Sequence, residues 1–131
     1  MKLHPDASQA PLVKALTLQW LQVDEQRFSQ SVLVSSWSGQ APLVWHPRTW
    51  ADLRTEDLVP LASSGAELVI LGSGHVLRLA LPAWWAPFAQ RRVGLESMDT
   101  AAACRTYNVL ASEGRRVLAA LILERPPSSA C

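Results

Sequence analysis

Two short polar clusters in this 131-residue chain carry the groups that could bind a ligand. The first is Gly-Ser-Gly at 72–74, directly after the apolar run 68–71, and the second begins at Asp99, after the next expected strand. Loops that follow parallel strands gather at one edge of an α/β sheet, where ligands usually bind. The candidate ligand-binding residues of the two clusters are Gly72, Ser73, Gly74, Asp99, Thr100, Cys104, Arg105 and Asn108.

The 72–74 turn and the helix that begins at Asp99 could hold an anion or another small molecule through backbone amides. The dinucleotide-binding fingerprint is incomplete, because Leu77 stands where its third glycine belongs and no helix follows at once. The Lys-Ser/Thr pair of phosphate-binding loops is missing as well. Turn glycines also serve simply to permit a positive φ, so both interpretations stay open.

Cys104 and Arg105 each have two readings on the helix expected at 99–113. A helix N-terminus and a nearby cation could lower the pKa of Cys104 and make it a nucleophile, whereas small thiols on helix flanks usually pack. Arg105 lies near the positive end of the helix dipole, which suits a neighbouring anion or carboxylate. The alternative is an ordinary exposed arginine.

A catalytic triad of Ser73, His75 and Asp99 can be assembled on paper. Ser73 and His75 are too close in sequence for this arrangement, and no nucleophile-elbow motif surrounds Ser73. The three histidines and two cysteines also lack metal-ligand spacing. We therefore predict no catalytic residue, metal or cofactor, and the sequence leans against an enzyme.

Hydrophobic patterning predicts the elements that position these residues. Strands at 15–21 and 28–34 form a hairpin through the polar connection 22–27. The remaining expected elements are a strand at 43–46, a short helix at 55–62 capped by Thr55 and interrupted by Pro60, a strand at 68–71, an extended piece at 76–80, a helix at 82–91, a strand at 93–98, the helix at 99–113 ended by Gly114, and a strand at 116–123.

The strands at 68–71 and 116–123 are apolar on consecutive residues, which indicates sheet strands covered on both faces. Strands that alternate with helices across 67–123 predict parallel pairing. The connection after Gly114 is too short for a helical crossover, so we expect the last strand to run antiparallel to some neighbour. The sheet is therefore predicted to be mixed, with helices around it.

Composition places the chain among globular proteins, with 49% hydrophobic and 18% charged residues. Twelve basic against 11 acidic side chains give no basic surface of the kind that binds nucleic acid. No apolar run approaches the roughly 18 residues of a membrane span, and the two cysteines suit a reducing compartment. We expect a cytoplasmic protein without an integral membrane segment, with an arm at 1–14, one domain at 15–124 and a tail at 125–131.

Six tryptophans are a large share of the aromatic residues, and two of them, Trp84 and Trp85, are neighbours. Successive residues of a helix point about 100° apart, so both rings can hardly be buried in one core. Tryptophan is enriched at protein interfaces. Trp84 and Trp85 are therefore the candidate partner-binding residues, with a core role as the alternative.

The segments 67–74, 98–110 (Met-Asp-Thr-Ala-Ala-Ala-Cys-Arg-Thr-Tyr-Asn-Val-Leu), 112–115 and 119–122 together resemble a known family. This is the adipogenesis-associated (Mth938-type) domain family of unknown function, and the resemblance covers 66–123 well and 15–65 in outline. It implies a three-layer α/β domain with a central mixed five-stranded sheet, flanking helices and an additional N-terminal β-hairpin. The family pattern falls on Asp99, Thr100, Cys104, Thr106, Asn108, Glu113, Gly114 and Arg115.

The resemblance implies no settled catalytic activity, and the family includes a mitochondrial respiratory complex I assembly factor. We therefore expect a non-enzymatic protein-binding or assembly factor with an unidentified protein partner. One alternative is a small-molecule or anion-binding protein, or an unrecognised enzyme, with a cleft between 72–75 and the start of the 99–113 helix. Another is a structural subunit of a homo-oligomer.

Overall fold

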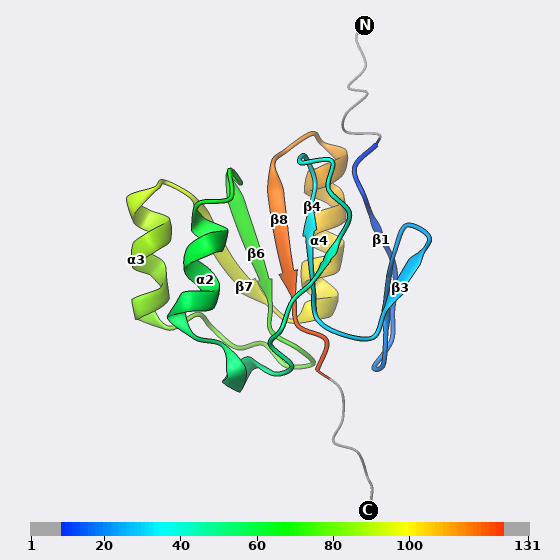
Figure 1. Cartoon of the computed structure of the whole chain (residues 1–131), viewed down its shortest axis with the longest axis horizontal. Coiled ribbons are helices and arrows are strands. Elements are labelled where there is room, and N and C mark those ends of the chain that lie inside the picture. Colours follow the sequence, from blue (N-terminus) through cyan, green and yellow to red (C-terminus); the bar gives the residue numbers. More distant parts are fainter. Residues whose placement is uncertain (1–8, 125–131) are drawn as a thin grey trace, which may run out of the picture.

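In the computed structural model, which describes residues 9–124, the chain forms a large and a small β-sheet with helices packed around them (Figure 1). The large sheet has five strands in the order β5-β4-β8-β6-β7. Their bounds are β4 Val32–Ser35, β5 Leu43–Val44, β6 Leu68–Gly72, β7 Gly94–Met98 and β8 Val117–Leu121. β6 is parallel to both of its neighbours, and β4 is antiparallel to β5 and β8. The predicted mixed five-stranded sheet is confirmed.

The two central strands are buried on both faces, because helices cover both sides of the sheet. Every residue of β6 and β8 is buried, as the consecutive apolar residues predict. The helix α4 (Thr100–Ser112) connects β7 to β8, so it is itself the crossover that makes β8 parallel to β6. The last strand was expected to run antiparallel to one neighbour, and this neighbour is β4.

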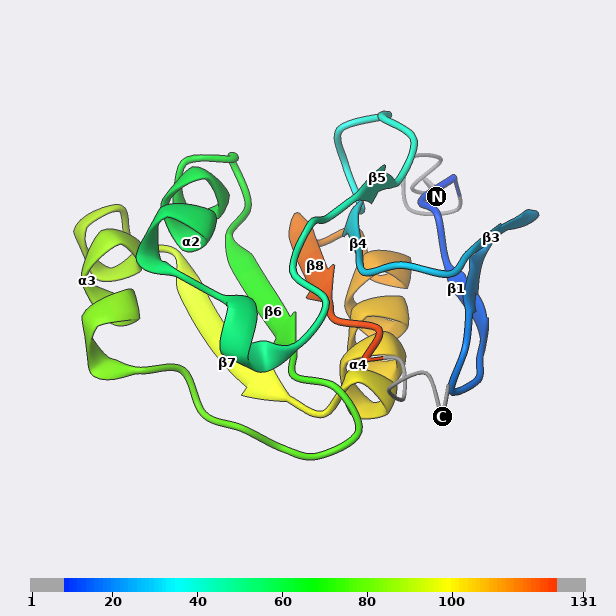
Figure 2. The ribbon, with the colours of Figure 1, turned by 60° about the horizontal axis from the view of Figure 1, so that its bottom comes forward.

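The large sheet separates the apolar interior into two cores, one on each of its faces, and helices cover both (Figure 2). On one face, α2 (Thr55–Ala62) and α3 (Pro82–Gln90) contribute Leu58 and Phe88, both fully buried. On the other face, α4 contributes Tyr107, also fully buried. None of the helices in residues 9–124 is both long and apolar enough to cross a membrane.

The small sheet consists of β1 (Val13–Leu16), β2 (Leu21–Val23) and β3 (Gln26–Phe28), paired antiparallel in this order. Its side chains Leu21 and Val23 share the core of α4, so the small sheet lies on the same side of the large sheet as α4 (Figure 2). An additional antiparallel unit near the N-terminus was predicted. Its register was not.

The predicted strands at 15–21 and 28–34 with a loop at 22–27 are wrong. The chain turns already at Thr17, whose hydroxyl accepts hydrogen bonds from the amides of Gln19 and Trp20. A second turn follows at Asp24, which has a φ of 51°. Residues 22–27 therefore belong to β2, this turn and β3, because polar side chains such as Gln22 and Arg27 pair across an exposed sheet face. The extended piece expected at 76–80 forms no strand.

The folded part begins earlier than the predicted boundary at residue 15, although residues 1–8 lie outside the described range, as does the predicted tail at 125–131. Ala10 and Val13 are buried. The Tyr107 hydroxyl donates to the Pro11 carbonyl at 2.7 Å. The Asn108 amide bonds both backbone groups of Val13, at 2.9 and 2.8 Å, so α4 fixes the start of β1.

Local capping explains where the helices begin and end. The Asp99 carboxylate accepts the Ala102 amide at 2.8 Å and starts α4, and Gly114, with a φ of 84°, follows its end, as predicted. The capping role expected for Thr55 is wrong, because Thr55 is the first residue of α2. Asp57 instead accepts the Arg54 amide at 3.0 Å and closes the first turn.

Candidate functional site

A pocket of about 490 Å³ lies at the edge of the large sheet where β6 and β8 end. Four segments meet there: the β1–β2 turn, the loop after β6, the start of α4 and the chain after β8. The residues that line the pocket are Leu16, Thr17, Leu18, Gly74, His75, Asp99, Thr100, Ala101, Ile122, Leu123 and Glu124. The pocket thus lies between 72–75 and the α4 N-terminus, where the sequence predicted a cleft.

The Thr100 side chain joins three of these segments. Its hydroxyl donates to the Ile122 carbonyl at 2.7 Å and accepts the Gly74 amide at 2.9 Å. The Thr100 amide in turn donates to the Gly74 carbonyl at 2.9 Å. Because Thr100 is only 4% exposed, these bonds satisfy backbone groups that water does not reach.

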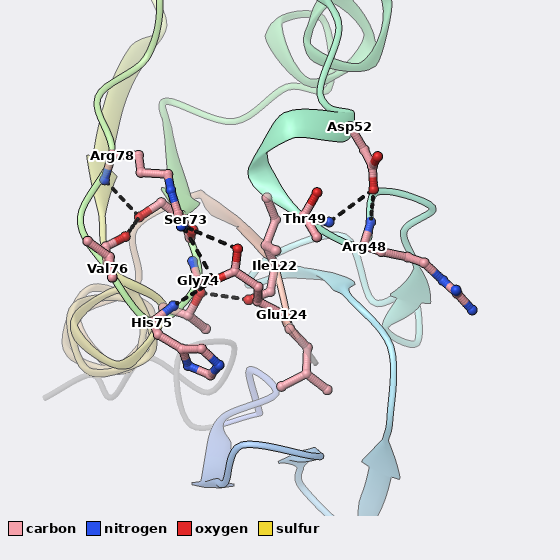
Figure 3. A network of polar contacts seen from close by, with 12 residues as sticks. Arg48, Thr49, Asp52, Ser73, Gly74, His75, Val76, Arg78, Ile122 and Glu124 are labelled. Atoms are coloured by element: carbon pink, nitrogen blue, oxygen red, sulfur yellow. Dashed lines mark hydrogen bonds and ion pairs between the residues drawn. The ribbon is translucent and has the colours of Figure 1, made fainter. Parts of the chain in front are cut away.

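Glu124 also contacts the loop after β6 (Figure 3). Its carboxylate accepts the His75 amide at 3.3 Å and pairs with the Arg78 guanidinium at 3.3 Å. Arg78 also donates to the Ser73 carbonyl at 2.7 Å. The guanidinium is therefore held by the protein's own acceptors.

The Ser73 hydroxyl forms its hydrogen bonds within its own turn. It donates to the Val76 carbonyl at 2.7 Å and accepts the Arg78 amide at 3.1 Å, and Ser73 is fully buried. The His75 imidazole points away from Ser73 (Figure 3). The structure therefore does not assemble the triad of Ser73, His75 and Asp99.

The candidate residues on the body of α4 lie outside the pocket. Cys104 is 6% exposed in the apolar core, and burial raises the pKa of its thiol to about 12. Arg105 is exposed, and Asn108 holds β1. Of the eight sequence candidates, Gly74, Asp99 and Thr100 line the pocket, while Gly72 and Ser73 lie buried next to it. Whether any of them binds a ligand stays a prediction.

The lining of the pocket is mainly apolar with two acidic groups, Asp99 and Glu124. It contains no lysine or arginine among residues 9–124, and the nearby Arg78 is already paired with Glu124. A helix N-terminus is equivalent to about half a positive charge, which is less than one carboxylate. This charge distribution disfavours the anionic ligand that the turn glycines and the helix end suggested.

Sequence reasoning missed two parts of the site. Glu124 lies at the last position of the predicted domain, and only its contact with Arg78, 46 positions away, reveals its role. Leu16 and Leu18 come from the small sheet, whose register was mispredicted. Neither part has a local sequence signal.

Trp84 and Trp85 differ in burial, as expected for adjacent helical positions. Trp84 is 3% exposed and its ring packs on Trp50 with a centroid distance of 5.3 Å. Trp85 is 45% exposed.

Within the part of the chain that the structure describes, no group of three or more His, Cys, Asp or Glu side chains is placed to hold a metal ion.

Comparison with known proteins identifies the family. A family model described as "Protein of unknown function (DUF498/DUF598)" matches residues 13–122. The chain belongs to this family. The resemblance to Mth938-type domains seen in the sequence is thereby confirmed, and a similar solved structure, from Bordetella pertussis, is described as a Mth938-like domain.

Two curated relatives of this DUF498/DUF598 member are NADH dehydrogenase [ubiquinone] 1 alpha subcomplex assembly factor 3 of Xenopus tropicalis and of Bos taurus. They are 34% and 32% identical over 85 residues, which make up 63% of this chain and 46% of each relative. The chain therefore matches about half the length of these relatives.

Solved structures share the fold over most of the chain. A Bordetella parapertussis protein is 32% identical with a TM-score of 0.79, and the match covers 86% of this chain and 95% of that one. A Xanthomonas campestris protein is 31% identical with a TM-score of 0.74, and it covers 93% and 89%. The Bordetella pertussis domain is 27% identical with a TM-score of 0.78, and it covers 95% and 94%.

Gly74→Ala should destabilise the protein by about 2–4 kcal/mol, since a side chain strains the left-handed backbone there and the Glu124 carboxylate must move and give up its bonds to His75 and Arg78. Gly74 has a φ of 104°, and an added Cβ would lie 2.5 Å from a Glu124 carboxylate oxygen. Urea unfolding followed by tryptophan fluorescence measures the change in the free energy of unfolding.

Gly39→Ala is the matched control, because Gly39 has a φ of 74° but no heavy atom within 4 Å of the added Cβ. It should cost only the backbone strain, about 1 kcal/mol. Equal decreases in the free energy of unfolding of the two variants would contradict the close packing of Gly74 against Glu124.

Cys104 should react with a thiol reagent at pH 8 more than about a hundredfold slower in the folded protein than in urea, since only the thiolate reacts. Burial of Cys104 and its pKa of about 12 both slow the reaction. The measurement uses the Cys131→Ser variant, so that Cys104 is its one thiol. Similar rates in the folded and unfolded protein would restore Cys104 as a reactive candidate.

Proposed function

We propose that this chain is a non-enzymatic protein-binding domain that acts as an assembly factor in the cytoplasm. The observation that carries the proposal is the similarity, within the family, to two proteins named as assembly factors of NADH dehydrogenase. An assembly factor acts by holding other polypeptides. Its partner is a protein, and a second copy of the chain is the alternative partner.

The states of the candidate nucleophiles support a non-enzymatic role. An activated serine or cysteine needs an accessible side chain next to a base. The Ser73 hydroxyl is buried and bonded within its own turn, and the Cys104 thiol is buried with a raised pKa. Both side chains contribute to the fold instead.

Five of the ten large hydrophobic side chains that are exposed in residues 9–124 lie in the loop before α3 and the first turns of this helix. Leu79 is 71% exposed, Leu81 is 52% exposed and Trp85 is 45% exposed, while Trp84 packs inward. Exposed apolar groups that gather in one segment mark interaction sites. Trp85 is therefore the side chain we expect to contact a partner, and Trp84 supports it from the core.

The pocket favours a second candidate function, the binding of a small molecule. Its volume of about 490 Å³ lies within the range of ligand sites, about 300–1,000 Å³. A thermal-shift screen of anions, nucleotides and amines tests this candidate, because a ligand that binds the folded state raises the Tm. No shift at millimolar concentrations of any of these compounds would rule it out.

Trp85→Gln should weaken partner binding by roughly tenfold or more, since a tryptophan hot spot contributes about 2 kcal/mol or more. A photo-cross-linking side chain at position 85 first captures the partner in cells that express the chain. The purified partner is then titrated against the wild-type protein and Trp85→Gln, whose Tm should be unchanged because Trp85 is exposed.

Position 109 is the matched control, since Val109 is 57% exposed on a different helix. A cross-linker there should capture nothing, and Val109→Gln should bind as the wild type does. Equal capture at 85 and 109 would contradict a partner surface at Trp85. Capture of the chain itself alone, with a dimer in light scattering, would replace the assembly role by that of a homo-oligomer.

A further inference from the structure

The lining of the pocket at the end of β6 and β8 combines apolar side chains with two carboxylates. Leu16 ends β1 and Leu18 lies in the β1–β2 turn, while Ile122 and Leu123 directly follow β8. Leu18 is 60% exposed, so a large apolar side chain of the lining still faces solvent. A ligand that covers Leu18 removes apolar surface from water, which favours binding.

The two carboxylates of the lining, Asp99 and Glu124, carry more negative charge than the structure balances nearby. Asp99 uses one oxygen, Oδ1, to cap α4, and no hydrogen bond between described residues uses Oδ2. The Glu124 side chain is 17% exposed, accepts the His75 amide and pairs with one guanidinium, that of Arg78. Two partly buried carboxylates in one lining with a single counter-charge, Arg78, favour a further cation, because low solvent exposure weakens screening.

We propose that this pocket binds a short segment of a partner protein in which a lysine or arginine side chain stands between apolar residues. The apolar neighbours would contact Leu16, Leu18 and Leu123, and the cation would lie between Asp99 and Glu124. The inference rests on the proposed protein-binding function and names the partner chemistry at one site. This site is separate from Trp85, which does not line the pocket.

Peptide mixtures titrated into the ¹⁵N-labelled full chain test the proposal by NMR. Each peptide has five residues, with flanks drawn from alanine, valine, leucine and phenylalanine and a fixed centre of lysine, arginine, glutamate or norleucine. The lysine and arginine mixtures should shift the amide signals of Leu18, His75, Ala101 and Leu123. The glutamate and norleucine mixtures should shift them at least about tenfold less at equal concentration, since they lack the cation.

Asp99→Asn and Glu124→Gln, singly and together, remove charge but retain hydrogen-bonding side chains, and asparagine still caps a helix well. The double variant should bind the lysine mixture about tenfold more weakly, and this binding should no longer depend on salt. Ala101→Arg places a fixed cation at the exposed Ala101 of the lining and should also prevent binding. Val109→Arg, at a position that is also exposed and lies about two turns further along α4, should leave binding unchanged.

Equal shifts from the norleucine mixture would overturn the charge part of the proposal, and no shift from any mixture would overturn the site. The proposed function is tested separately. If the partner captured at Trp85 binds the pocket variants as it binds the wild type, the assembly role stands and this inference fails.

Discussion

The Thr100 hydroxyl joins the loops that leave the carboxyl ends of β6, β7 and β8, and the pocket exists because these loops are held together. It bonds the Gly74 amide and the Ile122 carbonyl, while the Thr100 amide reaches the Gly74 carbonyl. Each bond satisfies a backbone group in a region that excludes water, where an unpaired group costs about 1–3 kcal/mol. A Cβ on Gly72 would lie 3.0 Å from this hydroxyl, so the approach also depends on a glycine.

This junction explains why residues that resemble a catalytic or anion-binding set serve the fold. Gly74 provides backbone groups for Thr100 and space for Glu124. Ser73 closes its own turn, and Arg78 pairs with Glu124 and with the Ser73 carbonyl. What remains open to a ligand is the apolar and acidic surface of the pocket.

The sequence predicts the parts of this arrangement that have local signals. Consecutive apolar residues locate β6 and β8, and Asp99 with Gly114 sets both ends of α4. The small sheet was misplaced because strand residues such as Gln22 and Arg27 face solvent and look like a loop. Long-range contacts also leave no local trace. Neither the pairing of Glu124 with Arg78 nor the attachment of Asn108 to Val13 could be read from sequence spacing.

Stability and amide exchange of a Thr100→Val variant test most directly whether the junction holds the site, since valine keeps the shape and removes the hydroxyl. Thr106→Val on the same helix is the control, because no hydrogen bond between described side chains involves Thr106. We predict that Thr100→Val lowers the free energy of unfolding by about 2 kcal/mol or more. We also predict faster hydrogen exchange at the Gly74 amide, with little change in either quantity for Thr106→Val. Equal stability and unchanged Gly74 protection in Thr100→Val would contradict the central role of this hydroxyl.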